Sequence, residues 1–136
     1  MSNNGNLDAL QGSLNIDFGL GSDRLNANDA QSGGLQAYTL TDSQIISTTG
    51  GGVRNFAGVS YTGAEFLQLQ GNQAFSEFTV TPSATVRYLL DGNLPQTNQL
   101  TITGSNDGRQ LFTSGEFAGI FSFDFFRDVQ FEQFAV

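Results

Sequence analysis

The sequence predicts an all-β protein of the parallel β-helix or β-solenoid type, and three observations support this prediction. Apolar and polar residues alternate with a period of two in several short segments, as in strands with one buried face. Clusters of Gly, Asn, Asp and Ser separate these segments and interrupt every helical pattern. The third observation is an internal repeat, because repeated β-segments favour units that stack and share one core.

Five segments show the alternation most clearly, and we expect each of them to form a strand. They are residues 14–18, 66–70, 78–81, 100–103 and 129–134. Turn-forming clusters lie between them, and their Gly, Asn and Asp residues tolerate the positive φ that tight turns require. Two clusters, Asp91-Gly92 and Asp107-Gly108, have the composition of two-residue hairpin turns. An antiparallel β-sandwich is therefore the alternative fold.

Internal sequence matches define the repeat. Leu14-Asn15-Ile16 matches Leu67-Gln68-Leu69 at a numbering offset of 53 (67 − 14). The second of these segments matches Val129-Gln130-Phe131 at an offset of 62 (129 − 67). A further match sets Phe56-Ala57-Gly58-Val59 against Phe117-Ala118-Gly119-Ile120 at an offset of 61 (117 − 56).

These matches set the expected domain organisation. We expect one β-solenoid domain over residues 14–136, built from about two internal repeats whose units begin near residues 14, 67 and 129. Residues 1–13 are expected to form an N-terminal cap or linker. Each unit is longer than one solenoid coil of about 20 to 30 residues, so we expect it to hold two or three coils.

Composition excludes several classes of function. The 136 residues include 13 acidic and five basic residues, giving a formal net charge of −8, and they include no His and no Cys. The missing His and Cys remove the commonest general base, the commonest metal ligand and every thiolate metal site. The negative charge disfavours nucleic acid and anionic membranes as partners. We therefore expect a protein that is not an enzyme.

The sequence also gives an expectation for localisation. Only 13% of the residues are charged, whereas soluble domains average about 25%, so the surface is polar but mostly uncharged. That composition is common among secreted bacterial β-proteins. No apolar run approaches the roughly 20 residues of a membrane helix, and residues 1–6 lack the features of a signal peptide. We expect an extracellular or cell-surface protein whose export signal is not in this sequence.

Four segments resemble a known kind of repeat, and the resemblance covers roughly residues 14–136. Residues 59–69 read VSYTGAEFLQL, residues 78–85 read FTVTPSAT, residues 90–95 read LDGNLP, and residues 100–104 read LTITG. This order resembles the tandem β-repeats of large secreted bacterial surface proteins, which are adhesin-like or RTX-like and calcium-binding. The resemblance implies a structural or adhesive extracellular scaffold with no catalytic residues. A calcium-stabilised module and a glycan-binding module are the alternatives that it leaves open.

One segment is a candidate calcium site. Residues 18–26 read FGLGSDRLN and resemble one copy of the RTX nonapeptide GGxGxDxUx, in which carbonyl and Asp oxygens of successive turns enclose Ca²⁺. The candidate oxygen donors are Asp23, Asn28 and Asp29. A single copy cannot enclose the ion, so a purely structural turn is the competing interpretation. No other cofactor is expected.

Three Thr-x-Thr elements form a second candidate. They are residues 39–41, 79–81 and 101–103. On a flat β-helix face, an array of such pairs orders water or binds ice. The competing interpretation is an ordinary solvated strand face, because Thr favours strands wherever its hydroxyl meets water. An ice-binding protein is therefore a further alternative function.

Acidic pairs are the remaining catalytic candidates. A polysaccharide-degrading enzyme of β-helix type needs two carboxyl groups about 5 to 10 Å apart. Asp124 with Asp128, and Asp107 with Glu116, are the pairs whose spacing fits this requirement. Isolated solvated acids are the competing interpretation, and no nucleophile, phosphate or zinc motif occurs.

The two end strands are the expected contact surfaces for a second copy of the chain or for neighbouring repeats. Residues 14–18 and 129–136 are expected to occupy equivalent positions in the repeat, and uncapped solenoid ends expose strand edges. Two complementary ends stack head to tail and form open filaments when the rotation does not close. The alternative is that the chain is a piece of a longer array whose neighbouring repeats cover these ends. A glycan or surface partner is the other expectation.

Overall fold

The computed structural model describes residues 7, 10, 12–31, 34–49, 58–93, 98–104, 108–115 and 118–134. These residues form twelve strands and no helix. The strands are β1 (Leu14–Asp17), β2 (Arg24–Asn28), β3 (Gln36–Leu40), β4 (Gln44–Thr49), β5 (Val59–Thr62), β6 (Phe66–Gln70), β7 (Ser76–Val80), β8 (Arg87–Asp91), β9 (Gln99–Ile102), β10 (Gln110–Gly115), β11 (Ala118–Ser122) and β12 (Val129–Glu132). The all-β prediction is confirmed.

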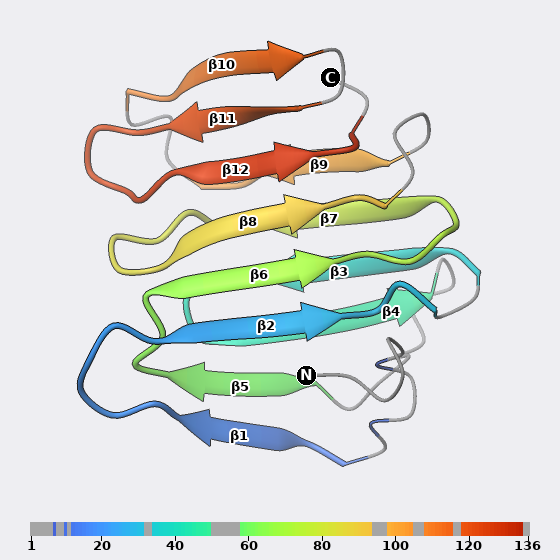
Figure 1. Ribbon diagram of the computed structural model, residues 1–136, viewed down its shortest axis with the longest axis vertical. Helices are drawn as coiled ribbons and strands as arrows, with labels where there is room; N and C mark the ends of the chain where they lie inside the picture. The colour runs from blue at the N-terminus through green and yellow to red at the C-terminus, as the bar shows by residue number, and fades with distance from the viewer. Residues whose placement is uncertain are drawn as a thin grey trace.

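The strands form two six-stranded mixed sheets. The first sheet has the order β1-β5-β4-β3-β7-β9, and the second has the order β10-β11-β12-β8-β6-β2. Figure 1 shows the two sheets as layers, with strands of each stacked along the long axis. Among the described strands, six neighbouring pairs are parallel and four are antiparallel. The layers are sandwich-like, but neither sheet is purely antiparallel or purely parallel.

The chain crosses between the sheets at every step from β5 to β9. β6 and β8 lie in one sheet and pair in parallel, with Phe66 opposite Arg87 at a numbering offset of 21 (87 − 66). β7 and β9 lie in the other sheet and also pair in parallel, with Glu77 opposite Gln99 at an offset of 22 (99 − 77). Each circuit of the two layers therefore adds one strand to each sheet at a nearly constant offset.

The core lies between the two layers because each strand turns alternate side chains inward. In β6 and β8 these include Leu67, Leu69, Tyr88 and Leu90, all fully buried. Phe78 joins Tyr38 and Phe134 in an aromatic cluster with ring centroids 4.8 Å apart in each pair. Aromatic residues bury more area than any other type, so this cluster contributes much of the core.

The N-terminal segment also contributes to the core. Leu7 is only 1% exposed, and its backbone N–H donates to Asp29 Oδ1 at 2.7 Å. Leu10 packs against the same core. Of the described residues in 1–13, Leu7 and Leu10 therefore pack on the domain.

Several predictions about turns and edges need correction. Asp91 ends β8 and Gly92 leads out of that sheet towards β9, so Asp91-Gly92 is a crossover and not a hairpin turn. Asp107 lies outside the described residues. β12 is paired on both sides, with β11 and β8, so residues 129–132 do not form an open edge. The strands at the sheet ends are β1 and β9 in one sheet and β2 and β10 in the other.

The strand register supports one of the three sequence matches that defined the repeat and not the other two. Leu67 stands opposite Tyr88, and Tyr88 opposite Val129, so the offset of 62 between Leu67 and Val129 (129 − 67) corresponds to one column of the sheet. The offset of 53 (67 − 14) does not correspond to stacking, because Leu14 lies opposite Val59 in the other sheet. The match of 56–59 with 117–120 also joins two sheets, since β5 and β11 are not in the same one.

Candidate functional site

The three Thr-x-Thr elements stack in register on one sheet. Thr39 of β3 stands opposite Thr79 of β7, and Thr79 stands opposite Thr101 of β9. The ladder continues one residue beyond the strands, because the N–H of Thr81 donates to Leu40 O at 3.0 Å and the N–H of Thr103 donates to Val80 O at 2.9 Å. Two columns of threonines result, which we call the threonine array: Thr39, Thr41, Thr79, Thr81, Thr101 and Thr103.

The threonine array lies on the outer face of its sheet. The residues between each pair of threonines point inward, and Leu40 and Val80 are 0% exposed. Thr39, Thr81 and Thr101 are exposed, and the other three members are partly exposed. The hydroxyls of Thr81 and Thr103 lie 3.0 Å apart and share a hydrogen bond. The array is therefore a connected, solvent-facing surface.

The strand positions around the threonine array carry little charge. On β4, Ile46 stands opposite Thr39. The neighbouring column of outward-facing residues across β3, β7 and β9 consists of Ala37, Glu77 and Gln99. Glu77 is the single charged side chain at the outward strand positions of β3, β4, β7 and β9, and none of these positions holds an aromatic side chain.

Two buried tyrosines hold the backbone beneath the array. The Tyr61 hydroxyl donates to Thr41 O, and the Tyr88 hydroxyl donates to Thr81 O at 3.2 Å. Burial raises the pKa of both tyrosines well above the ordinary value of a phenol, and the nearby Asp42 carboxylate raises it further. Both hydroxyls therefore stay protonated and remain donors.

The structure does not bring the candidate calcium donors together. Asp23 precedes β2, whereas Asn28 ends that strand and Asp29 follows it. Five residues of extended chain separate Asp23 from Asn28, which is about 16 Å. Oxygens that share one Ca²⁺ lie at most about 5 Å apart, because each is roughly 2.5 Å from the ion. The three residues therefore cannot form one site.

Two of these donors already have other roles. Asp29 is fully buried, and its second oxygen accepts from the Tyr38 hydroxyl at 2.7 Å. Asn28 accepts from Ala30 N and donates to the Gln70 side chain. Asp23 Oδ2 has no hydrogen-bond partner in the described part of the chain. No cluster of three or more metal-ligating acids occurs among the described residues.

We therefore expect Ca²⁺ to leave stability unchanged. Millimolar Ca²⁺ and a chelator should give the same thermal midpoint, because a ligand stabilises only in proportion to its occupancy of the folded state. Differential scanning calorimetry measures this directly. A midpoint that rises with Ca²⁺ and falls again in an Asp23→Ala variant would show that Asp23 binds calcium with donors other than Asn28 and Asp29.

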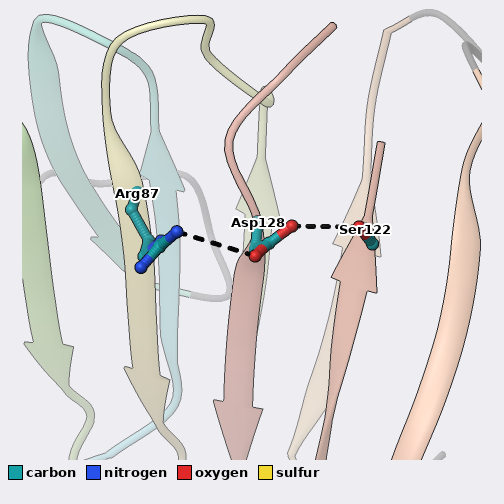
Figure 2. Close-up of polar contacts among 3 residues, drawn as sticks. All are labelled: Arg87, Ser122 and Asp128. Carbon is teal, nitrogen blue, oxygen red and sulfur yellow. Dashed lines mark hydrogen bonds and ion pairs between the residues drawn. The ribbon is translucent and has the colours of Figure 1, made fainter. Parts of the chain in front are cut away.

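Of the two candidate acid pairs, Asp124 with Asp128 lies among the described residues. Asp128 accepts from the Ser122 hydroxyl at 3.1 Å and forms an ion pair with Arg87 at 3.8 Å, as Figure 2 shows. Asp124 is exposed in the turn between β11 and β12. Asp107 and Glu116 lie outside the described residues. The contacts of Asp128 position the turn before β12.

A shallow depression of about 310 Å³ lies beside β1, β4 and β5. Its polar lining includes Asn15, Asp17, Ser43, Gln44, Ser60 and Thr62. Asp17 Oδ1 accepts from the Thr62 hydroxyl and from Gly19 N, so the one acid of this lining is held by local bonds. The depression contains no second carboxylate from the described residues to complete an acid–base pair.

The outer face of the other sheet carries a ladder that sequence reasoning missed. Asn28 Nδ2 donates to Gln70 Oε1 at 2.8 Å, and Gln70 Nε2 donates to Asp91 Oδ2 at 2.9 Å. The Arg24 guanidinium lies 4.3 Å from the centre of the Phe66 ring. The sequence signal for the ladder was a polar residue at the end of each of three strands, namely Asn28, Gln70 and Asp91. The register between the strands was needed to show that these three residues align.

Comparison with known protein families, with curated proteins and with solved structures yields no match. The resemblance to bacterial surface repeats therefore stays a prediction. None of the described segments forms a helix long and apolar enough to cross a membrane.

Proposed function

We propose that this chain is a structural scaffold segment of β-solenoid type that extends its two sheets into a neighbouring unit. One observation carries the proposal: in each sheet, the strands at the two ends run in the same direction. From β1 to β9 the sheet contains two antiparallel steps, at β5–β4 and β4–β3. From β10 to β2 the other sheet also contains two, at β10–β11 and β11–β12.

Matching directions favour a neighbour that is shifted along the long axis. Such a neighbour places its β1 beside β9 and its β2 beside β10, with both new pairs parallel. Figure 1 shows that this axis is the direction in which the strands are stacked. A head-to-tail contact of this kind is heterologous, and it produces an open filament when the rotation does not close. In the isolated chain, the neighbour is a second copy.

Composition and sequence resemblance support the same role. The charge of −8 and the absence of His and Cys agree with a non-enzymatic, non-nucleic-acid-binding segment. The resemblance to bacterial surface repeats, over roughly residues 14–136, implies a scaffold outside the cell that is a structural or adhesive part of a surface protein. The nearly equal offsets of the parallel pairs β6–β8 and β7–β9 support the solenoid description.

Asn15→Pro in β1 tests this proposal. The N–H groups of Leu14 and Phe18 point to β5, so the N–H of Asn15, one residue along, points to the other edge. Proline removes that donor and blocks edge pairing while leaving the β1–β5 ladder intact. We expect wild-type chain to form species whose mass rises with concentration, and the variant to stay monomeric, as measured by light scattering after size-exclusion chromatography.

The control is Asn15→Thr, which keeps the backbone donor and favours a strand. It should assemble like the wild type, and electron microscopy should show elongated particles for both. A wild-type chain that is monomeric at every concentration contradicts the proposal, as does an Asn15→Pro variant that is folded and still assembles.

A further inference from the structure

We infer that the threonine array binds the ordered water of an ice surface. This inference concerns the outer face of the β3–β7–β9 sheet and is independent of the strand edges used in head-to-tail stacking. The ligand is a crystalline lattice of water and not a soluble molecule.

The spacing of the threonine array is a two-dimensional lattice. Neighbouring strands lie about 4.8 Å apart, which sets the distance between rows. Residues i and i+2 on one face of a strand lie about 6.6 Å apart, which sets the distance between the two columns. Ice has oxygen repeats close to both distances, so the hydroxyls of Thr39, Thr79 and Thr101, and of Thr41 beside Thr39, can match lattice positions in two directions. The Thr81 and Thr103 hydroxyls depart from this spacing, because they lie 3.0 Å apart and share a hydrogen bond. The register between β3, β7 and β9 has no shift that would break this spacing.

The chemistry of threonine suits a water lattice. A threonine hydroxyl donates one hydrogen bond and accepts two, so it can replace a water molecule of the lattice. In the array, Thr103 donates to Val80 O at 3.2 Å and Thr81 donates to Thr103, so these two hydroxyls meet the lattice as acceptors. The methyl group on the same carbon contacts water without bonding to it. Because threonine is branched at Cβ, its χ1 is restricted and both groups are held in fixed directions.

The scaffold beneath the threonine array is rigid. β3 and β7 are each paired on both sides. Leu40 and Val80 are fully buried under the array, and the Tyr61 and Tyr88 hydroxyls hold the backbone at Thr41 and Thr81. A surface that is ordered before binding loses less conformational entropy when it binds. The array should therefore lose less conformational entropy on binding than a flexible polar surface would.

The surroundings favour ice over a soluble or polymeric ligand. Sugar rings commonly stack on aromatic side chains, and the outward positions of β3, β4, β7 and β9 hold none. Glu77 is the one charge at these strand positions, and the exposed Asp42 follows Thr41, so the charges beside the array are acidic and disfavour an anionic partner. The threonines come from three segments that are well separated in the sequence, yet the register places them in one block.

The test measures thermal hysteresis and inhibition of ice recrystallisation by the full chain. Thr79→Tyr places a bulky ring at the middle row of the array, and Thr101→Tyr does the same on β9. Tyrosine favours strands, so both variants should fold. Gln130→Tyr is the matched control, because Gln130 is exposed at the middle of β12 in the opposite sheet.

We expect wild type and Gln130→Tyr to shape ice and inhibit recrystallisation, and both threonine variants to lose most of this activity. Circular dichroism confirms that each variant is folded, and Thr101→Tyr serves if Thr79→Tyr does not fold. A wild-type chain without either activity overturns the inference. So does equal activity in all variants, or loss in the control as well. Threonine-dependent retention on crystalline cellulose or chitin without any effect on ice would also overturn it, in favour of a polysaccharide.

Discussion

Replacing Asn98 with alanine should lower the free energy of unfolding by about 3 kcal/mol. Asn98 is fully buried, and its side chain joins three separate segments. Its Nδ2 donates to Gly92 O at 2.6 Å and to Gln133 O at 3.1 Å, and its Oδ1 accepts from Ser76 N at 3.0 Å. Alanine leaves these three backbone groups without their partner, and each unpaired buried group costs roughly 1 to 3 kcal/mol.

Urea denaturation followed by circular dichroism measures this loss. The matched control is Gln99→Ala at the next position, where the side chain is exposed. Surface substitutions of this kind change stability by less than about 0.5 kcal/mol. An Asn98→Ala variant within experimental error of the control would show that water replaces the amide at no cost.

Alkaline pH should destabilise the protein through Tyr61 and Tyr88. Both phenols have a pKa raised by burial, so they bind their protons more tightly in the folded state than in the unfolded state. Their contribution is complete below the unfolded pKa of about 10 and is lost as the pH rises above it, because the unfolded chain then ionises first. At pH near 12 the two residues together should remove about 3 to 5 kcal/mol.

Urea denaturation at a series of pH values tests this dependence. The double variant Tyr61→Phe with Tyr88→Phe should show a shallower fall above pH 10, since phenylalanine does not ionise. At neutral pH it should be less stable than wild type by about 1 kcal/mol for each lost hydrogen bond. An equally steep fall in the double variant would show that the alkaline transition arises elsewhere.

Periodicity was enough to find strands but not to place them in a sheet. The alternation at residues 14–18, 66–70 and 129–134 predicted β1, β6 and β12. A strand that turns back in a hairpin and one that crosses to the other layer show the same alternation, so the sequence could not distinguish them. β4 turns back beside β3 and adds a strand without a crossing.

That extra strand explains the error in the repeat. Leu25 stands opposite Leu67 at a numbering offset of 42 (67 − 25), because β4 and β5 lengthen this part of the chain. The offset from β6 to β8 is half of that, at 21 (87 − 66). Because the number of residues between stacked strands varies, the sequence shows no constant repeat length. The match between the short apolar segments at Leu14 and Leu67 therefore paired strands that lie in different sheets.

The candidate sites depended on information of different kinds. The Thr-x-Thr elements were visible in the sequence, but their alignment required the register between distant strands, such as those that hold Thr39 and Thr79. The acidic residues were visible too, but their burial was not. Asp29 accepts hydrogen bonds from Leu7 N and from the Tyr38 hydroxyl inside the core. The sequence alone does not distinguish an Asp with this structural role from an Asp that binds calcium.

The long-range parallel pairing has a consequence for the kinetics of folding. Even the parallel pair that is shortest in sequence, β6 with β8, has the whole of β7 between its two strands. Long loops must close before such pairs gain any stability, and chains of this kind fold in milliseconds to seconds. The β3–β4 hairpin is local, so we expect it to form early. The remaining strands then spend time with their edges unpaired, and aggregation competes with folding during that interval.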